Sequence, residues 1–373
     1  MVNLYKFFLL FIFLFIGALD ARINYSLENT NYSISQESAL NRSLKTYHYN
    51  YNRTRLKAQF LEKNFFSNLS LDAINYYDHN YLRSTEFSYL KSLRSDTPFS
   101  TQSTFNDHKN NTNYAKLHRL YLGYEDDQNL LKLGLQNITM GVGRFWSPTN
   151  LFNPKNIYAL EADETFGVMA INYTRYLNDT TSLHLVGSLK ENKTHKYALR
   201  YKTFLNFGEL ALNMIHSDTT KMIGYELEAN LFDSGVEVRS EGAFIDSDPQ
   251  DGSKLNFYQG ILGAEYGFVN GLNLSFEALY SSHKFKPLEI QKNLHSDLLP
   301  NMTQSNYYAG VSTAYTFNIF LDGSLLYIEN FNSHEDPFAS FVLNYTLNDY
   351  NTFTIGLISQ KQKTYYLRYH LAF

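Results

Sequence analysis

The feature that most constrains the fold is an alternation of apolar and polar residues with a period of two. In Leu272–Tyr280, apolar residues occupy every second position, and Asn273, Ser275 and Glu277 lie between them. The segments 195–203, 221–232 and 365–373 show the same alternation. Successive side chains of a strand point to opposite faces, so this pattern predicts strands with one apolar and one wet face. No segment keeps a helical period, and we expect an all-β fold.

The lengths of these segments indicate where the strands lie. Most are about 10 to 14 residues long, whereas strands in soluble sheets average about 5 to 6. A tilted strand that crosses a bilayer needs about 9 to 11 residues. From Asn113 onward, short connections alternate with generally longer ones. We therefore predict a transmembrane antiparallel up-and-down β-barrel of about 16 to 18 strands, because only a closed sheet satisfies its backbone groups in lipid.

Composition narrows the function classes further. The chain has 31 Tyr and 29 Phe but one Trp, and only 18% of its residues are charged, which is few for a soluble surface. It has no Cys, which excludes a disulfide framework, thiolate metal sites, a catalytic cysteine and a lipoprotein anchor. The net charge of −4 argues against a nucleic acid as partner.

The N-terminus has the pattern of an export signal. Lys6 precedes the apolar run Phe7–Ile16, and small residues follow. A run this short is typical of a secretory signal peptide rather than of a membrane anchor, which needs about 20 apolar residues. We expect residues 1–21 to be the signal peptide, cleaved after Ala21 or, as second choice, after Ala18. Residues 22–52 are expected to be a polar lead-in, with an additional strand as the alternative, and 53–373 the barrel.

The C-terminal strand carries a family resemblance. Apolar or aromatic residues occupy alternate positions up to a terminal Phe: Tyr365, Leu367, Tyr369, Leu371 and Phe373. This ending resembles that of Gram-negative outer-membrane proteins, in which it is the signal read by the barrel assembly machinery. The mature chain as a whole resembles barrels of the porin type, and Gly134–Pro154 is similar to a loop found in several porin-like barrels.

The resemblance implies a location and a function. We expect an outer-membrane channel for passive diffusion of small hydrophilic solutes, surrounded by lipid, with no cofactor or metal; a homotrimer is among the expected assemblies. Two alternatives stay open. One is a substrate-specific transporter or exporter of an oligosaccharide, an acidic polymer or a fatty acid. The other is an enzyme or adhesin on a barrel scaffold, although none of the 11 His is followed two positions later by Ser, as outer-membrane phospholipases require.

The loop Gly141–Asp163 is the most specialised part of the chain. It holds the only Trp and two of the seven Pro, and we expect it to be ordered. If it folds into the barrel, Arg144 and Lys155 would face acidic residues across a constriction and sort solutes by charge. The alternative is an outward loop that packs on the rim. The candidate constriction residues are Arg144, Trp146, Lys155, Glu161, Asp163 and Glu164.

Charged residues on the predicted strands form a second group of candidates, expected to face the lumen. They are Lys132, Lys196, Arg200, Lys202, Glu226, Glu228, Glu237, Arg239, Glu241, Glu265, Glu277 and Arg368. One interpretation is that they solvate a wet interior. The other is a strip of opposed charges, acidic from Glu226 to Glu241 and basic from Lys196 to Lys202, that selects polar or charged solutes.

Overall fold

The structure is a computed structural model, and it describes residues 22–38, 46–93, 95, 97–156, 158–190, 194–248, 254–293, 296–332 and 336–373. The expected signal peptide, residues 1–21, lies outside the described residues. These contain 19 strands: β1 (Arg22–Glu37), β2 (Thr46–Glu62), β3 (Phe65–Tyr77), β4 (Gln102–His108), β5 (Asn111–Glu125), β6 (Asn129–Gln136), β7 (Val168–Asn178), β8 (Thr181–Leu189), β9 (His195–Leu205), β10 (Gly208–Ser217), β11 (Thr220–Asn230), β12 (Glu237–Ser247), β13 (Leu255–Gly267), β14 (Leu272–Ser281), β15 (Tyr307–Asn318), β16 (Leu321–Asn330), β17 (Phe338–Asn348), β18 (Asn351–Ser359) and β19 (Lys363–Ala372).

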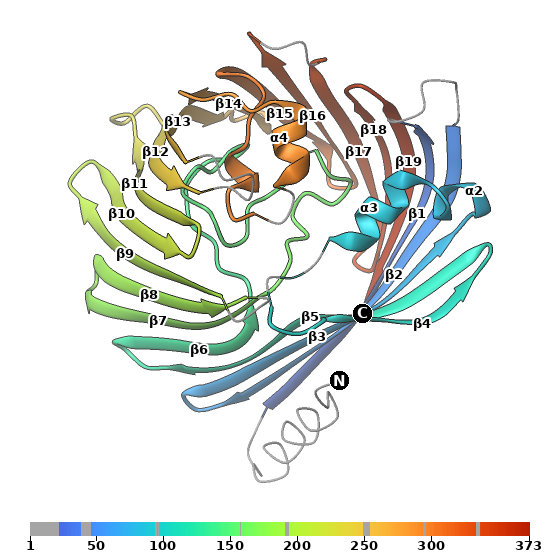
Figure 1. Ribbon diagram of the computed structural model, residues 1–373, viewed down its shortest axis with the longest axis horizontal. Helices are drawn as coiled ribbons and strands as arrows, with labels where there is room; N and C mark the ends of the chain where they lie inside the picture. Colours follow the sequence, from blue (N-terminus) through green and yellow to red (C-terminus); the bar gives the residue numbers. More distant parts are fainter. Residues whose placement is uncertain are drawn as a thin grey trace.

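The strands close into one antiparallel barrel (Figure 1). Each strand pairs with its neighbours in sequence, except that β3 pairs with β5 and that β19 returns to pair with β1. β4 pairs only with the first six residues of β5 and adds to the rim. Without β4, the wall has 18 strands, as the lengths of the sequence segments predicted. Closure leaves the wall no free edge, which a barrel in lipid requires.

The two ends of the barrel differ. At one end, here the turn end, connections such as 179–180 and 349–350 are two residues long. At the other, the loop end, three long connections occupy residues 78–110, 137–167 and 282–306. The expectation that residues 22–52 form a lead-in is wrong, because β1 and the start of β2 lie there and complete the wall. Toward the loop end, the outward positions of these two strands, such as Asn31, Ser33 and Asn50, are polar rather than apolar.

The outer surface carries the apolar half of the alternation. Ile171, Met214, Ile223, Leu262 and Ile355 are each more than half exposed there. The turn end is edged by aromatic residues: Phe65, Tyr124, Tyr176, Phe207, Phe232, Phe268, Phe320, Tyr350 and Phe373. Such an edge is typical of a barrel that meets a membrane interface. Among the described residues, no helix is long and apolar enough to cross a bilayer.

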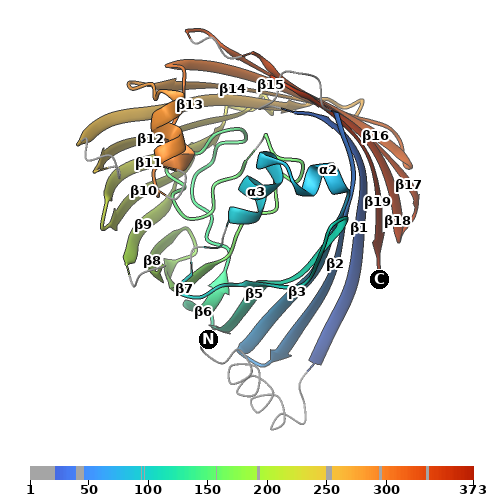
Figure 2. The same ribbon diagram turned by 45° about the vertical axis from the view of Figure 1, so that its right-hand side comes forward.

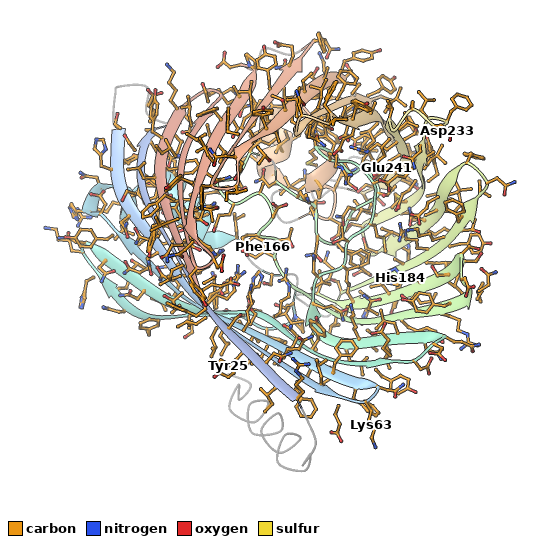
Figure 3. All side chains as sticks on the ribbon, turned by 180° about the vertical axis from the view of Figure 1, so that it is seen from behind. Tyr25, Lys63, Phe166, His184, Asp233 and Glu241 are labelled. Carbon is orange, nitrogen blue, oxygen red and sulfur yellow. The ribbon has the colours of Figure 1, made fainter. Side chains whose placement is uncertain are left out.

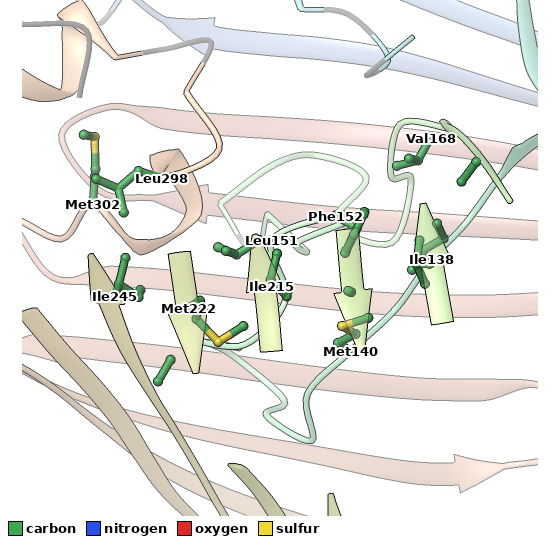
Figure 4. Close-up of a cluster of buried hydrophobic side chains, with 14 of the residues drawn as sticks. Ile138, Met140, Leu151, Phe152, Val168, Ile215, Met222, Ile245, Leu298 and Met302 are labelled. Atoms are coloured by element: carbon green, nitrogen blue, oxygen red, sulfur yellow. The ribbon is translucent and has the colours of Figure 1, made fainter. Parts of the chain in front are cut away.

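Much of the interior is occupied by the long connections. The connection 78–110 carries α2 (His79–Leu82) and α3 (Thr85–Ser92), and 282–306 carries α4 (Pro287–Lys292) and the 3-10 helix η2 (Leu299–Asn301). Figure 2 shows α3, α4 and the coil of 137–167 inside the ring of strands. Apolar side chains of 137–167 and 282–306 pack on inward residues of β7–β13: Ile138, Met140, Leu151, Phe152, Leu298 and Met302 belong to this core (Figure 4).

Candidate functional site: a segment that crosses the lumen

The segment 137–167 enters the barrel between β6 and β7 and contacts distant parts of its inner wall (Figure 1). Residues near 141–149 bind to strands β11, β12 and β14. Tyr158 packs edge-on against Phe338 of β17, with ring centroids 4.9 Å apart. Glu161 and Glu164 bind to arginines of β2. The segment is therefore inside the lumen, and of the two arrangements left open by the sequence, the structure has the inward one.

One end of the segment is fixed by Glu241 of β12. Its carboxylate is buried and accepts hydrogen bonds from the backbone N–H groups of Val142 at 2.8 Å and of Thr149 at 2.6 Å. The Thr149 and Ser147 hydroxyls donate to it at 2.7 and 3.0 Å. In Figure 3, Glu241 lies on the inner side of the wall, as does His184 of β8. Hydrogen bonds to an ionised carboxylate are stronger than neutral ones, so Glu241 is a firm anchor.

Two more wall glutamates hold the same turn. Glu277 of β14 accepts from the backbone N–H groups of Arg144 at 2.8 Å, Phe145 at 3.0 Å and Trp146 at 2.8 Å. Glu226 of β11 accepts from the Gly141 N–H at 2.8 Å. Together these three carboxylates satisfy backbone donors of a coil that has no strand partner there. We call Glu226, Glu241 and Glu277 the glutamate clamp.

The local sequence permits this close approach. Gly141 has a φ of +87°, and a Cβ atom there would lie 1.8 Å from the Ser147 hydroxyl oxygen and 2.6 Å from the Glu241 carboxylate. At Gly143, a Cβ atom would lie 1.6 Å from the Trp146 carbonyl oxygen. Both glycines are thus required by the turn that presents its N–H groups to the clamp.

The expected partners of Arg144 are wrong. Its guanidinium contacts Glu265 of β13 at 3.0 Å and Glu237 of β12 at 3.1 Å, not the acidic residues of its own loop. The same two glutamates bind the fully buried Arg239, each at 2.7 Å. The Trp146 ring packs against Tyr308, with ring centroids 5.9 Å apart. Arg144 and Trp146 therefore attach the segment to the wall.

The other end of the segment reaches a cluster of cations on β2. Arg53 contacts both carboxylate oxygens of Glu161 at 3.0 Å. Arg55 donates to both carboxylate oxygens of Glu164 at 2.9 Å. Its guanidinium also donates to both carboxylate oxygens of Asp72 on β3, at 2.6 and 2.8 Å. Paired hydrogen bonds of this kind fix orientation as well as charge. We call Arg53, Arg55, Asp72, Glu161 and Glu164 the ion-pair bridge.

The two loop carboxylates of the bridge differ in acidity. Burial raises the pKa of Glu161 above its ordinary 4.5, and Arg53 offsets only part of that rise. Burial acts on Glu164 too, but the hydrogen bonds from Arg55 and the charges of Arg53 and Arg55 outweigh it, so the pKa of Glu164 is lowered. The remaining pair, Lys155 and Asp163, is exposed and lies 3.0 Å apart within the segment.

Sequence reasoning missed the basic side of this site. The expected lumen and constriction residues include neither Arg53 and Arg55 of β2 nor Lys116 and Arg119 of β5. Lys116 lies 4.3 Å above the Phe166 ring, and Arg119 donates to the Thr165 carbonyl at 2.9 Å. Figure 3 shows Phe166 inside the ring of strands. The available signal was Arg53, Arg55 and Lys57 at alternate positions, which puts three cations on one face.

The connection 282–306 is anchored by a second buried charge cluster. Asp297 lies 2.6 Å from the Lys190 ammonium and 2.8 Å from that of Lys196 on β9. Lys196 also donates to the Leu151 carbonyl at 2.7 Å, and Asn301 donates to the Pro148 carbonyl at 2.9 Å. Burial tends to raise the pKa of Asp297, but the two lysines lower it to about 2. The two connections are therefore tied to each other and to the wall.

The strand charges proposed for the lumen all lie on inward faces, yet most are paired. Arg200 binds Glu226, Lys202 binds Glu209, and Arg368 donates to Thr354. Lys132 lies over the Tyr121 ring at 5.9 Å, and Glu228 neighbours Glu237. The acidic row from Glu226 to Glu241 thus holds a loop in place, which neither of the two interpretations from sequence included.

Comparison with solved structures addresses the fold. OccAB1 of Acinetobacter baumannii superposes with a TM-score of 0.61 at 7% identity, over 94% of this chain and 96% of that one. OccK8 (OprE) of Pseudomonas aeruginosa gives 0.59 at 10% identity, over 95% and 98%. The chain has the fold of these Occ proteins. The Occ barrel OpdK of P. aeruginosa, an outer membrane protein, gives 0.56 at 7% identity, over 94% and 99%. No protein-family model and no curated protein matches the sequence.

Proposed function

We propose that the chain is an outer-membrane channel through which small hydrophilic solutes diffuse without an energy source or a cofactor. The observation that carries this proposal is the segment 137–167, which narrows the lumen of an 18-stranded barrel while leaving the wall intact. A barrel of this size encloses an aqueous channel unless a loop fills it. The apolar outer face of this barrel, its aromatic turn end and the fold it shares with the Occ proteins support a location in the outer membrane.

The narrowest part of the path is proposed to lie beside the ion-pair bridge. In that region the cations Arg53, Arg55, Lys116 and Arg119 stand against the acids Asp72, Glu161 and Glu164. Four positive groups against three negative ones leave an excess of positive charge in a confined space, where fields are strong. We therefore propose a preference for small anions over cations.

A substrate-specific channel is the second candidate. It is favoured by the two inward connections, which share an apolar core inside the barrel. One Occ structure, OpdK of P. aeruginosa, was solved with vanillate, an aromatic carboxylate. Under this candidate, the chain conducts simple ions weakly and accelerates the passage of a few organic anions.

For assembly, we propose that the barrel assembly machinery reads the last strand. Tyr365 and Leu367 of β19, and Phe373 directly after it, are exposed on the outer surface, where a partner can reach them. We also propose that residues 1–21 are removed on export, and that the barrels associate as a homotrimer.

Conductance of the purified chain in planar bilayers tests the function. We expect single-channel steps in simple salt, with a reversal potential that favours the anion. Swelling of proteoliposomes in a panel of sugars, amino acids and small carboxylates then separates the two candidates. Size-dependent passage of all solutes supports a general channel; passage of carboxylates alone supports the specific one. A reconstituted barrel that passes no ion and no solute would refute both.

A further inference from the structure

One sector of the outer wall is polar. In the pairing of β1, β2, β3 and β5, Asn31 stands opposite Asn52, Asn52 opposite Asn75, and Asn75 opposite Asn113. On β4, Asn106 stands opposite Asn113 and extends the line. We call Asn31, Asn52, Asn75 and Asn113 the asparagine row. Figure 2 shows β1, β2 and β3 side by side along one flank of the barrel.

The row faces outward. On β2, Arg53 and Arg55 reach the segment inside the lumen, so Asn52 and Thr54, which alternate with them, point to the other side. On β1, Thr30 contacts the inward His370, which places Asn29 and Asn31 outside. Ser33 and Ser35 continue this face of β1 toward the loop end.

The row lies at the height of an apolar belt. On β19, Tyr369 stands opposite Asn31, and Leu367 opposite Ser33. Leu367 is 57% exposed on the outer surface, and Leu27 of β1, nearer the turn end, is 44% exposed. The β1 part of the row is thus flanked by residues suited to hydrocarbon, although its own side chains are amides and hydroxyls.

The amides of Asn31 and Asn52 are only half satisfied within the chain, whereas Asn75 donates to both Asn111 and Asn113. Asn31 exchanges one pair of hydrogen bonds with Asn50, at 3.2 and 3.0 Å, and Asn52 exchanges one pair with Asn29, both at 3.2 Å. Each primary amide has two N–H donors and two lone pairs. Among the described residues, one donor and one lone pair of Asn31, and likewise of Asn52, have no partner. Hydrocarbon cannot supply a hydrogen-bonding partner for these groups, and a polar group left without a partner in the membrane is costly.

We propose that the asparagine row is the surface through which copies of this chain associate in the membrane. An amide donates and accepts equally, so the row is complementary to itself. Its four members carry no charge, and copies can therefore meet without like-charge repulsion. Rotation about the membrane normal brings the same row of each copy to a common axis, which gives a closed assembly. This rests on the proposed membrane location and names the contact surface of the proposed homotrimer.

The chain has no native cysteine, which makes site-directed cross-linking direct. Asn31→Cys and Asn52→Cys test the row, and Phe341→Cys, an exposed position on β17, is the control. Membranes that contain each variant are treated with a short bis-maleimide, and the products are weighed by mass spectrometry. We expect the Asn31 and Asn52 variants to yield a product of twice the chain mass, and the Phe341 variant to stay single.

A second measurement does not depend on cross-linking. The double variant Asn31→Leu/Asn52→Leu is expected to lose the oligomer in lipid nanodiscs, whereas Phe341→Leu keeps it. Wild-type channels should insert into planar bilayers as grouped conductance steps, and the double variant as single ones. Products joined to another protein, equal cross-linking at Phe341, or a monomeric wild-type barrel that conducts would each overturn the proposal; the last leaves the channel function standing.

Discussion

The carboxylate of Glu241 accepts a 2.6 Å hydrogen bond from the backbone N–H of Thr149, which lies 92 residues earlier in the chain. This contact joins a coil to a strand in the middle of the barrel wall. Together with the contacts of Glu226 and Glu277, it fixes the position of the segment 137–167 relative to the wall. Changes in the wall should therefore act on conduction without touching the segment itself.

Replacement of Glu241 by Gln should release the segment. Gln has one oxygen in place of two, and its NH₂ group would face the N–H donors of Val142 and Thr149. Each hydrogen bond to a charged group contributes about 1.5–3 kcal/mol, so we expect a loss on the order of 3 kcal/mol and a larger, noisier single-channel conductance. Glu209→Gln is the control, because Glu209 binds Lys202 on the wall. Unchanged conductance in Glu241→Gln would show that the clamp does not set the opening.

Substitution of Gly141 by Ala should have the same effect from the loop side. A Cβ atom would overlap the Ser147 hydroxyl and meet the Glu241 carboxylate at a positive φ of 87°. Backbone strain of this kind costs about 1–3 kcal/mol. We expect a raised conductance and faster proteolysis of residues near 141–149. Gly267→Ala, where a Cβ atom meets nothing within 4 Å, should resemble the wild type in both assays.

Asp297→Asn should loosen the connection 282–306. The side chains of Asp297 and Lys196 are only 5% and 2% exposed, and removal of one partner from a buried ion pair costs about 3–5 kcal/mol. We expect a lower temperature for the heat-induced mobility shift on gels, and no change in the exposed variant Asp233→Asn. Because the folded-state pKa is about 2 against 3.8, this stabilisation is complete above 3.8 and is lost as the pH falls through 2.

Acidification should change selectivity through Glu161. Its raised pKa means that it takes up a proton above pH 4.5, whereas Glu164 stays charged to below 4.5. Protonation of Glu161 removes a negative charge from the ion-pair bridge, so anion preference should rise as the pH falls from 7 toward 4.5. Reversal potentials measured across this range report it. Glu161→Gln should show the raised anion preference already at pH 7, with no further rise as the pH falls. Glu164→Gln should keep the rise between pH 7 and pH 4.5.

Arg55→Gln should reduce anion preference. The substitution removes a cation that binds both Asp72 and Glu164, and leaves the buried Asp72 without its partner. We expect the reversal potential to move toward the cation and the stability to fall by about 3 kcal/mol. Lys57→Gln is a matched control on the same strand, since Lys57 pairs with Glu28 away from the bridge. Equal shifts in both variants would indicate a general charge effect.

The strand pattern was predictable wherever the outer face is apolar. Segments such as Leu272–Tyr280 show two distinct faces in sequence, and the barrel and its strand number followed from them. β1 was missed for a physical reason: its outward positions from Asn29 to Ser35 are polar, and its apolar residues there, Tyr32 and Ile34, point inward. A strand segment whose outward positions are polar lacks the alternation by which barrel strands are recognised.

The site was predictable only in part. Pro, Gly and Trp marked 141–163 as ordered, because these residues restrict or permit particular backbone turns. The ion partners were not predictable, since Arg144 meets residues about a hundred positions away and nothing local selects Glu265 over Glu161. Arg53 and Arg55 were missed because the start of β2 was expected to belong to the lead-in, which left these arginines at its boundary.

The pairing of β1 with β19 has a consequence for biogenesis. Residues 28–36 bond to residues 364–372, so the first strand of the wall finds one of its two neighbours only in the last strand of the wall. Until β19 is made, both ends of the growing sheet are open to strands of other molecules. A copy truncated before Lys363 leaves them open permanently. Such fragments should therefore aggregate or be degraded rather than accumulate as smaller rings.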